Sequence, residues 1–314
     1  GVGVGEATLS PAAHSLISDA FPAERRSPAL GIYNIGGNVG IMLGFMLGGY
    51  IGEHLGWRQA FLVVGLPGLL AALLVRTTLR EPARGRLEGR VDDEEAPGLS
   101  EVLRYMASQR SFRHLCLASA FYAFAAYGFT IWGATFLIRV HGMSLTETGV
   151  AMGLIQGLGG GLGTYLGGRL ADRFAKRDER ALVGVPAVGG LLALPLLALF
   201  LFLPDRSGAL AAYALAMVFS VFFVGPSYAV AQGLARLRMR AQAAAWLMFA
   251  INLIGLGIAP LAVGVLNDAL ADRLGDEAIR YSLMITGAVS LWAVVHSFWA
   301  ARSIREDLAA ARVA

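Results

Sequence analysis

Three polar side chains recur every four residues in an apolar stretch at the start of the sequence: Glu6, Ser10 and His14. This spacing puts them on one face of a helix. A carboxyl group among apolar neighbours is costly to ionise, so burial raises its pKa toward the range where it exchanges protons. The pattern predicts proton transfer at Glu6, with His14 as a second candidate. The alternative is that Glu6 lies near a water-exposed helix end and that His14 is solvated.

A second group combines one acid with several bases at the end of an apolar segment. Residues 168–177 read GRLADRFAKR and include Gly168, Arg169, Asp172, Arg173, Lys176 and Arg177. We expect Asp172 to face the positive N-terminus of a neighbouring helix, and the bases to meet carboxylates or lipid phosphates. Such contacts would stabilise one of two helix arrangements, as a conformational switch requires. The alternative is an ordinary basic loop.

Other polar and aromatic residues inside apolar segments are candidates for lining a solute cavity. In the first part of the chain they are Ser10, Tyr33, Asn34 and Asn38, and further along they are Tyr127, Trp132, Gln156, Tyr228, Gln232, Trp246 and Asn252. Two asparagines in one apolar helix need polar partners, which a water-filled cavity supplies. Packing is the competing interpretation for each aromatic residue. Tyr127 and Asn252 are the better candidates because they fall in mid-segment.

Glycines are frequent inside the apolar segments. Gly36, Gly40, Gly44 and Gly48 form a ladder on one helix face, which predicts close contact with another helix there. The run at 157–163 is a point where a helix could bend.

The elements that carry these residues are membrane-spanning helices. Of the 314 residues, 56% are hydrophobic and only 15% are charged, whereas soluble domains average about 25% charged residues. Segments of roughly 20 apolar residues are long enough to cross a bilayer. We expect nine, at 1–20, 29–52, 59–79, 113–139, 147–169, 182–204, 208–234, 241–266 and 280–303.

Arginine and lysine are distributed unequally between the two ends of these helices. If the turns after the first, third, fifth and seventh segments and the C-terminus face the cytoplasm, that side holds 21 of the 26 basic residues. The other five are Arg58, Arg139, Arg206, Arg273 and Arg280. The positive-inside rule therefore predicts a cytoplasmic C-terminus.

One long polar interval, at about 80–112, divides the chain into three expected parts. These are a first helical bundle at 1–80, a cytoplasmic linker at 81–112 and a second bundle at 113–314. Leu99, Leu103, Met106 and Phe112 are spaced for a short amphipathic helix within the linker. A faint repeat at an offset of 214 residues aligns Arg26, Ala29 and Asn38 with Arg240, Ala243 and Asn252, which fits two bundles related by a repeat.

Several functional classes are disfavoured. A single cysteine, Cys116, excludes a disulfide scaffold, and the net charge of +4 is explained by the cytoplasmic bias rather than by nucleic acid. The sequence has no H-E-x-x-H, G-x-S-x-G or P-loop motif and no Cys/His cluster, so we expect no metal, no cofactor and no enzymatic activity. A membrane-embedded lipid-modifying enzyme and a receptor built on a transporter fold remain as alternatives.

Residues 168–177 resemble the G-x-L-a-D-R-x-G-R-K signature of the major facilitator superfamily between helices 8 and 9, with Ala175 where glycine is usual. Further segments resemble Spinster-like members: GVGEA at 3–7, DAFP at 19–22, GWRQAF at 56–61, WGATFL at 132–137, GPSY at 225–228, RMRA at 238–241 and INLIGLG at 251–257. Together these segments cover most of the chain as helices 4 to 12 of twelve.

This resemblance implies an all-α membrane fold of two pseudo-symmetric six-helix bundles, with helices 1 to 3 preceding Gly1. It implies a proton-coupled transporter of alternating access for a small amphipathic, anionic or lipid-like organic solute. Glu6 matches an acidic residue thought to couple protonation to transport, but the usual arginine and aspartate partners would also precede Gly1. We therefore expect this stretch alone to be inactive, and the protein to be a monomer in a bacterial inner membrane.

Overall fold

The computed structural model describes residues 13, 16–17, 20–21, 23–78 and 98–313, and every regular element among them is a helix. The first part contains α2 (Ala23–His54) and α3 (Trp57–Thr78). After α4 (Leu99–Ser108) come α5 (Arg110–His141), α6 (Leu145–Leu154), η1 (Ile155–Gly159), α7 (Gly160–Ala175), α8 (Ala181–Phe202), α9 (Arg206–Ser220), α10 (Val224–Leu234), η2 (Leu237–Met239), α11 (Arg240–Ala250), η3 (Ile251–Ile258), α12 (Ala259–Leu274), η4 (Gly275–Glu277), α13 (Ala278–Ala288) and α14 (Ser290–Val313).

Six helical segments among the described residues are long and apolar enough to cross a membrane. They are Gly31–His54, Trp57–Thr78, Arg110–His141, Ala181–Phe202, Arg206–Leu234 and Arg240–Arg312, the last of which holds the two final expected spans. The expected span at 147–169 is helical, but it is too rich in glycine to reach the same hydropathy. The span expected at 1–20 falls almost entirely outside the described residues.

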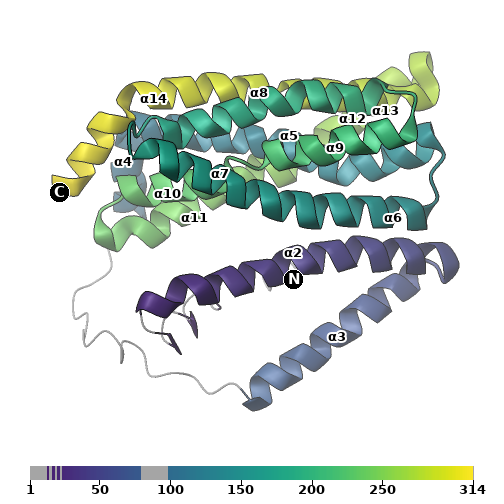
Figure 1. The fold of residues 1–314 in the computed structure, drawn as a ribbon, viewed down its shortest axis with the longest axis horizontal. Helices are drawn as coiled ribbons and strands as arrows, with labels where there is room; N and C mark the ends of the chain where they lie inside the picture. The colour runs from purple at the N-terminus through teal and green to yellow at the C-terminus, as the bar shows by residue number, and fades with distance from the viewer. Residues whose placement is uncertain (1–12, 14–15, 18–19, 22, 79–97, 314) are drawn as a thin grey trace.

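The molecule consists of a helical bundle with a two-helix hairpin beside it. Residues 110–313 form the bundle, and α2 and α3 form the hairpin (Figure 1). Helix α2 runs alongside α6, whereas α3 diverges from the bundle and buries none of its residues. Two clusters of buried apolar side chains fill the bundle, one built around Phe112, Tyr122 and Leu247 and the other around Phe136, Phe200 and Tyr213.

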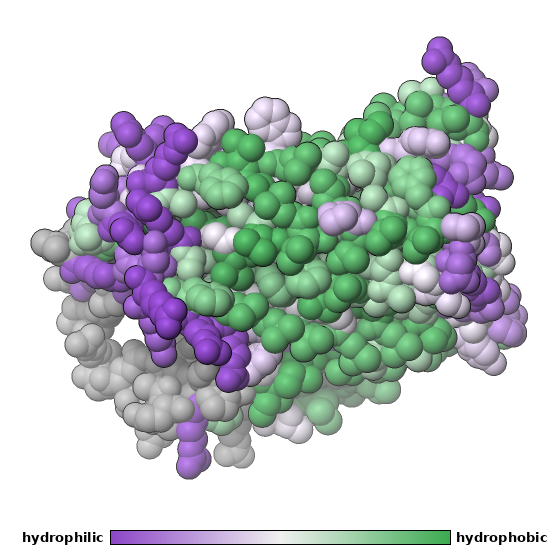
Figure 2. Space-filling view, turned by 45° about the horizontal axis from the view of Figure 1, so that its top comes forward, coloured by the Kyte–Doolittle hydropathy of each residue, from purple (hydrophilic) through white to green (hydrophobic). Residues whose placement is uncertain are grey.

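The surface is arranged as a bilayer requires. Figure 2 shows an apolar belt across the middle of the molecule, with hydrophilic residues gathered at both ends. The end that holds the end of α7, the α10–α11 turn and the end of α14 is called the arginine-rich end. The opposite end, where α2 finishes and α6 begins, is called the Glu53 end. Side chains of α3 such as Phe61 and Leu69 are 75% and 69% exposed, which is expected for side chains whose solvent is lipid.

Two spans change from α-helical to π-helical hydrogen bonding in mid-course. The first is η1, between α6 and α7, and the second is η3, between α11 and α12. The glycine run at 157–163 was expected to weaken its helix, and η1 overlaps its beginning. Because π segments disturb the regular ladder, they place irregular backbone in the middle of these spans.

The close helix contact expected for the glycine ladder on α2 is not found among the described residues, so it stays a prediction. Within that part of the chain, nothing lies within 4 Å of a Cβ placed at Gly36, Gly40, Gly44 or Gly48. The close contact involves a different ladder, on α6 and η1. A Cβ placed at Gly149 would lie 2.5 Å from the Phe45 carbonyl oxygen, and one at Gly153 would lie 2.7 Å from that of Met42. A Cβ placed at Gly157 would lie 2.7 Å from Met42 Cβ, so these three glycines let α6 and η1 approach Met42 and Phe45 of α2 closely.

The short amphipathic helix of the linker exists, but its buried face differs from the expected one. Helix α4 buries Val102 and Met106 completely, whereas Leu103 is 39% exposed. The helix ends at Ser108, so Phe112 belongs to α5. Gln109 donates from Nε2 to the Leu234 carbonyl at 2.9 Å, which fixes the end of α4 to the bundle.

Candidate functional site

The proposed proton-exchange face lies outside the described residues. Glu6, Ser10 and His14 all belong to the part of the chain whose structure is not described. Their roles therefore remain predictions from the sequence.

The polar residues of α2 lie where the hairpin and the bundle begin to part. Asn38 is half-buried and donates from Nδ2 to the Asn34 carbonyl at 3.2 Å. Across from it, a Cβ placed at Gly161 would lie 3.6 Å from the same Nδ2 atom. Asn34 is exposed, and Tyr33 is half-buried one helical turn before Gly37. Of the three, the structure brings Asn38 to the facing helix.

Aromatic side chains from three helices gather in the second bundle. Tyr127 of α5, Tyr228 of α10 and Trp246 of α11 are all partly buried against the same core cluster. Tyr127 also packs on η3, where a Cβ placed at Gly255 would lie 3.1 Å from its ring. Asn252, on η3, is half-buried. The indole nitrogen of Trp246 is buried and has no hydrogen-bond partner among the described residues, which is costly for a donor unless another molecule supplies the acceptor.

Two other predicted cavity residues have partners inside the bundle. Trp132 donates from Nε1 to the Pro260 carbonyl at 3.0 Å, joining α5 to α12. Gln156 is 5% exposed, and its Nε2 donates to Thr130 Oγ1 at 3.0 Å and to the Tyr213 hydroxyl at 3.1 Å. Both arrangements account for the polar atoms through contacts between helices.

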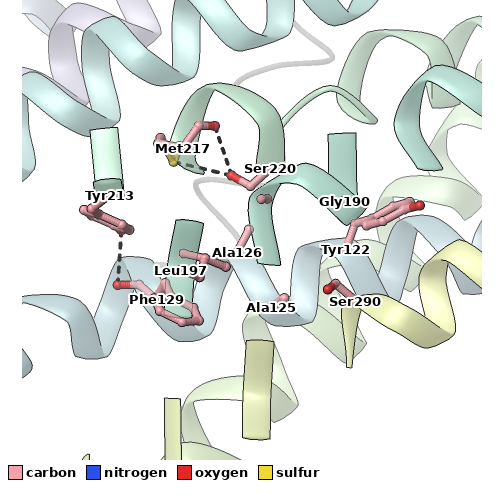
Figure 3. A pocket seen from close by; sticks show the side chains of 11 residues that line it. Tyr122, Ala125, Ala126, Phe129, Gly190, Leu197, Tyr213, Met217, Ser220 and Ser290 are labelled. Atoms are coloured by element: carbon pink, nitrogen blue, oxygen red, sulfur yellow. Dashed lines mark hydrogen bonds between the residues drawn. The ribbon is translucent and has the colours of Figure 1, made fainter. Parts of the chain in front are cut away.

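The described residues line a small cavity inside the bundle and a much larger groove between α6 and α9. The small cavity, of about 20 Å³, lies between α5, α8, α9 and α14. Figure 3 shows Tyr122, Phe129, Tyr213 and Ser290 among the side chains that line it. It has room for a water molecule and not for an organic solute. A wider groove of about 630 Å³ lies between α6 and α9, with apolar walls and the Glu147–Arg206 ion pair (2.8 Å) at its edge. Its volume is in the range of ligand pockets.

The basic motif at 168–177 lies at the arginine-rich end, on the last turns of α7. Arg169 donates to the Tyr165 hydroxyl at 2.6 Å, and Gly168 lies near Gly225 of α10. The side chains of Asp172, Arg173, Lys176 and Arg177 are exposed, and none of them forms an ion pair within the part of the chain that the structure describes. No hydrogen bond between Asp172 and a helix N-terminus is found among the described residues, so the expected contact stays a prediction.

The carboxylates just after the motif, which the sequence analysis did not single out, do form contacts. Asp178 pairs with Arg305 at 2.7 Å, and Glu179 pairs with Arg312 at 2.6 Å, so the turn after α7 is tied to the end of α14. A hydrogen bond from the Arg180 amide, assisted by Arg305, lowers the pKa of Asp178 below its ordinary value. Sequence alone could have suggested these pairs only through the charges of opposite sign.

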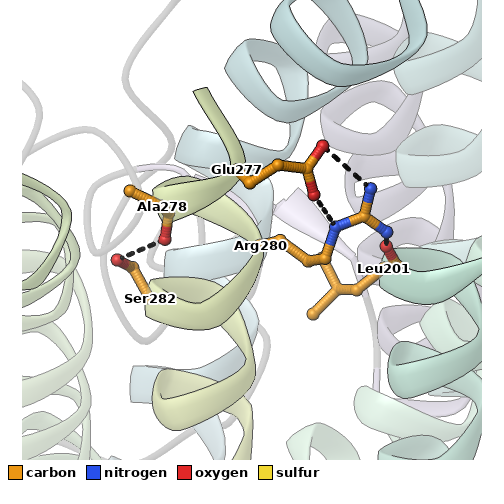
Figure 4. Close-up of polar contacts among 5 residues, drawn as sticks. All are labelled: Leu201, Glu277, Ala278, Arg280 and Ser282. Atoms are coloured by element: carbon orange, nitrogen blue, oxygen red, sulfur yellow. Dashed lines mark hydrogen bonds and ion pairs between the residues drawn. The ribbon is translucent and has the colours of Figure 1, made fainter. Parts of the chain in front are cut away.

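An arginine that was counted only for topology connects two helices at the Glu53 end. Arg280, on α13, pairs with Glu277 at 2.6 Å and donates to the Leu201 carbonyl near the end of α8 (Figure 4). Its guanidinium also lies over the rings of Phe136 and Phe202, at 5.7 and 5.5 Å. A cation suits this position because the unpaired carbonyls of a helix C-terminus carry partial negative charge.

Comparisons with known proteins agree with this architecture. The family model of the Major Facilitator Superfamily matches residues 2–260. An MFS-type efflux pump of Mycolicibacterium smegmatis is 33% identical over 98% of this chain and 71% of the pump. Protein spinster homolog 1 of Homo sapiens is 33% identical over 44% of this chain and 27% of that protein.

Solved structures extend the comparison to three dimensions. A bacterial homologue of the human lysosomal transporter Spinster, in an inward-facing and unoccupied conformation, superposes with a TM-score of 0.85 at 28% identity. The match covers 98% of this chain and 77% of that one. The fucose:proton symporter of E. coli, at 20% identity and a TM-score of 0.54, shares the fold. The chain thus belongs to the major facilitator superfamily, as a Spinster-like membrane transporter.

Proposed function

We propose that this protein moves a small organic solute across the membrane by alternating access, and that the described conformation is closed at the Glu53 end. The observation that carries the proposal is the one-sided contact between hairpin and bundle. Helix α2 meets α6, η1 and the start of α7 from Gly52 and Leu145 to Asn38 and Gly161. It separates from the bundle toward Ala23 (Figure 1). Closure at one end alone is what a transporter in one of its two states requires.

The solute path that we propose runs along the faces that part from one another. Asn38 on α2, and Tyr127, Tyr228, Trp246 and Asn252 on the bundle, would contact the solute. The buried indole N–H of Trp246 supports this role because it has no acceptor among the described residues. Aromatic and amide groups favour an amphipathic organic molecule over an inorganic ion. Two relatives are named as an efflux pump and, in Dickeya chrysanthemi, as a galacturonate transporter. The second name supports an organic solute.

We further propose proton coupling through Glu6, with His14 assisting. A carboxyl group on a membrane-spanning helix can change protonation between the two sides of the membrane. The 21 to five distribution of basic residues supports a bacterial inner membrane with the arginine-rich end and the C-terminus in the cytoplasm. The same proposal includes a monomer of two bundles joined by a linker at 81–112.

The full-length protein, reconstituted into liposomes, tests both parts of the proposal. Proteoliposomes are loaded with ethidium or with radiolabelled galacturonate, and flux is measured with and without a pH gradient. We expect flux above that of empty liposomes for at least one probe, and we expect Glu6→Gln to remove its dependence on the gradient. Glu101→Gln, on the surface of α4, is the matched control. Gradient-driven flux that survives Glu6→Gln unchanged would exclude Glu6 from coupling.

A further inference from the structure

A hydrogen bond joins α2 of the hairpin to α6 of the bundle at the Glu53 end. Glu53 is the penultimate residue of α2, and its Oε2 accepts the backbone N–H of Thr146 at 2.6 Å. Thr146 is the second residue of α6, whose N-cap is Ser144. The two groups are 93 positions apart in the chain, so the bond reports directly on the position of the hairpin against the bundle.

The start of α6 is prepared for a carboxylate from outside the helix. Ser144 and Glu147 already form a reciprocal capping box, with Ser144 Oγ accepting the Glu147 amide and Glu147 Oε2 accepting the Ser144 amide. Glu147 is in turn neutralised by Arg206 at 2.8 Å. The Thr146 amide lies outside this box, and Glu53 supplies its acceptor. A carboxylate at this position also benefits from the positive helix N-terminus.

Close backbone packing beside the bond makes it dependent on closure. A Cβ placed at Gly49 would lie 2.5 Å from the Leu145 carbonyl oxygen and 3.0 Å from Gly149 Cα. Glu53 lies one helical turn beyond Gly49 on α2. A hydrogen bond loses its strength within a few tenths of an ångström beyond its optimum, so a small separation of α2 from α6 would break this bond. The glycines permit the contact, and Glu53 stabilises it with a charge-assisted hydrogen bond.

We propose that Glu53 is a gating residue, whose carboxylate stabilises the closed Glu53 end by capping α6 from across the interface. This inference rests on the proposed alternating-access function and adds to it the residue that holds this end shut. Glu53 touches no part of the proposed solute path, so it is a positioning residue. Its loss should change the balance between the two states without removing the solute site.

The test measures the distance between the two parts directly. Spin labels are placed at Leu55→Cys, just after α2, and at Ser207→Cys, at the start of α9, in a Cys116→Ser background. Double electron–electron resonance on the protein in nanodiscs then gives the fraction of molecules with a long label separation. We expect Glu53→Ala to raise the ratio of long to short separations about threefold to tenfold, as expected for losing a charge-assisted hydrogen bond at a solvent-exposed site.

Three further variants test whether the shift in label separation comes from losing the hydrogen bond between Glu53 and Thr146. Glu53→Gln keeps an acceptor oxygen and should have a smaller effect than Glu53→Ala. Thr146→Pro removes the donor in a helical turn that tolerates proline, and it should have no additional effect in the Glu53→Ala background. Glu101→Ala is the control for losing an exposed glutamate elsewhere.

Each outcome bears on Glu53 separately from transport. A distance distribution that is unchanged in folded Glu53→Ala protein, judged by an unaltered thermal unfolding curve, would overturn the gating role even if solute flux is observed. Equal shifts in Glu53→Ala and Glu101→Ala would also overturn it. Conversely, a shift specific to Glu53 in a protein that moves neither probe would support the gate and count against the proposed solutes.

Discussion

Gln156 is a polar side chain in the middle of an apolar span, and its environment explains its presence. Its amide donates to α5 through Thr130 and to α9 through Tyr213, whose hydroxyl in turn donates to the Phe129 carbonyl at 3.4 Å. It also lies on η1, where the π-helical turn interrupts the regular ladder. The residue therefore connects three segments of one bundle at the level of the membrane.

Replacing Gln156 tests this structural role. In Gln156→Leu the size is kept, but Thr130 and Tyr213 lose their shared donor, which should cost about 1–3 kcal/mol of stability. We expect a clearly lower unfolding temperature for the detergent-solubilised protein. Gln232→Leu, which alters an exposed amide on α10, is the control. If the two variants unfold at the same temperature, the buried network does not stabilise the bundle.

The amide residues also show where sequence reasoning reaches its limit. Asn38 and Gln156 were predicted together as cavity residues, because any amide in an apolar span needs polar partners. The structure places Asn38 at the parting of hairpin and bundle, and Gln156 within the bundle. A bundle interior and a water-filled cavity satisfy an amide equally well, so residue type alone could not separate them. Glu53 was overlooked because a carboxylate at a helix end is usually just solvated.

At the scale of elements, hydropathy located the described spans well but could not assign their contacts. The ends of α3, α5 and α8 fall within three residues of the expected segments, whereas α2 begins at Ala23, six residues before the expected start. The partner of each face was not predictable, because lipid and a neighbouring helix are both apolar surroundings. The two glycine ladders show this: the one on α2 meets no other described residue, and the one on α6 and η1 meets α2.

A matched pair of glycine substitutions tests that assignment. Gly149→Ala places a methyl group against the backbone of Phe45 and Gly49, and overpacking of this kind costs about 1–3 kcal/mol. We expect α2 to move away from α6, reducing several-fold the cross-linking of Gly52→Cys to Leu145→Cys by a short bismaleimide. Gly48→Ala adds a methyl group with no described residue within 4 Å, so it should cross-link as the parent does. Equal cross-linking in both variants would contradict the close approach at Gly149.

The ion pair between Asp178, in the α7–α8 turn, and Arg305 of α14 should make the stability of the protein depend on pH. The Arg180 amide and Arg305 lower the pKa of Asp178 in the folded protein. A carboxyl group with a lowered folded pKa contributes stability above its ordinary pKa of about 4 and loses it as the pH falls through the folded value. Because the pair is exposed, Asp178→Asn should lower the unfolding temperature at pH 7 by only about 1–2 °C.

The difference between Asp178→Asn and the parent should stay constant from pH 7 down to about pH 4 and close below it. Thermal unfolding of both proteins across this range measures it. A gap that persists at pH 3 would show that Asp178 acts through something other than its charge.

At the scale of the whole molecule, the hairpin and the bundle pack closely at the Glu53 end, whereas the charged motif is exposed at the arginine-rich end. At the Glu53 end the backbones of Gly49 and Gly149 meet and Glu53 caps α6. At the arginine-rich end Asp172, Arg173, Lys176 and Arg177 are exposed. None of these side chains forms an ion pair among the described residues, as expected for a motif that acts in the other state.

This opposition predicts how two substitutions combine. Glu53→Ala should weaken the described state, and Asp172→Asn should weaken the state in which the arginine-rich end is closed. Both residues bias one equilibrium, so their effects should have opposite signs. The end of α2, which carries Glu53, and the end of α7, which carries Asp172, lie at opposite ends of the molecule (Figure 1). Because the two residues share no partner among the described residues, their free energies should add. We expect Glu53→Ala alone to raise the fraction of molecules with a long separation between the labels at Leu55→Cys and Ser207→Cys. Adding Asp172→Asn should lower that fraction again. A double variant that matches Glu53→Ala alone would mean that Asp172 takes no part in the switch and that the motif serves only to orient the chain in the membrane.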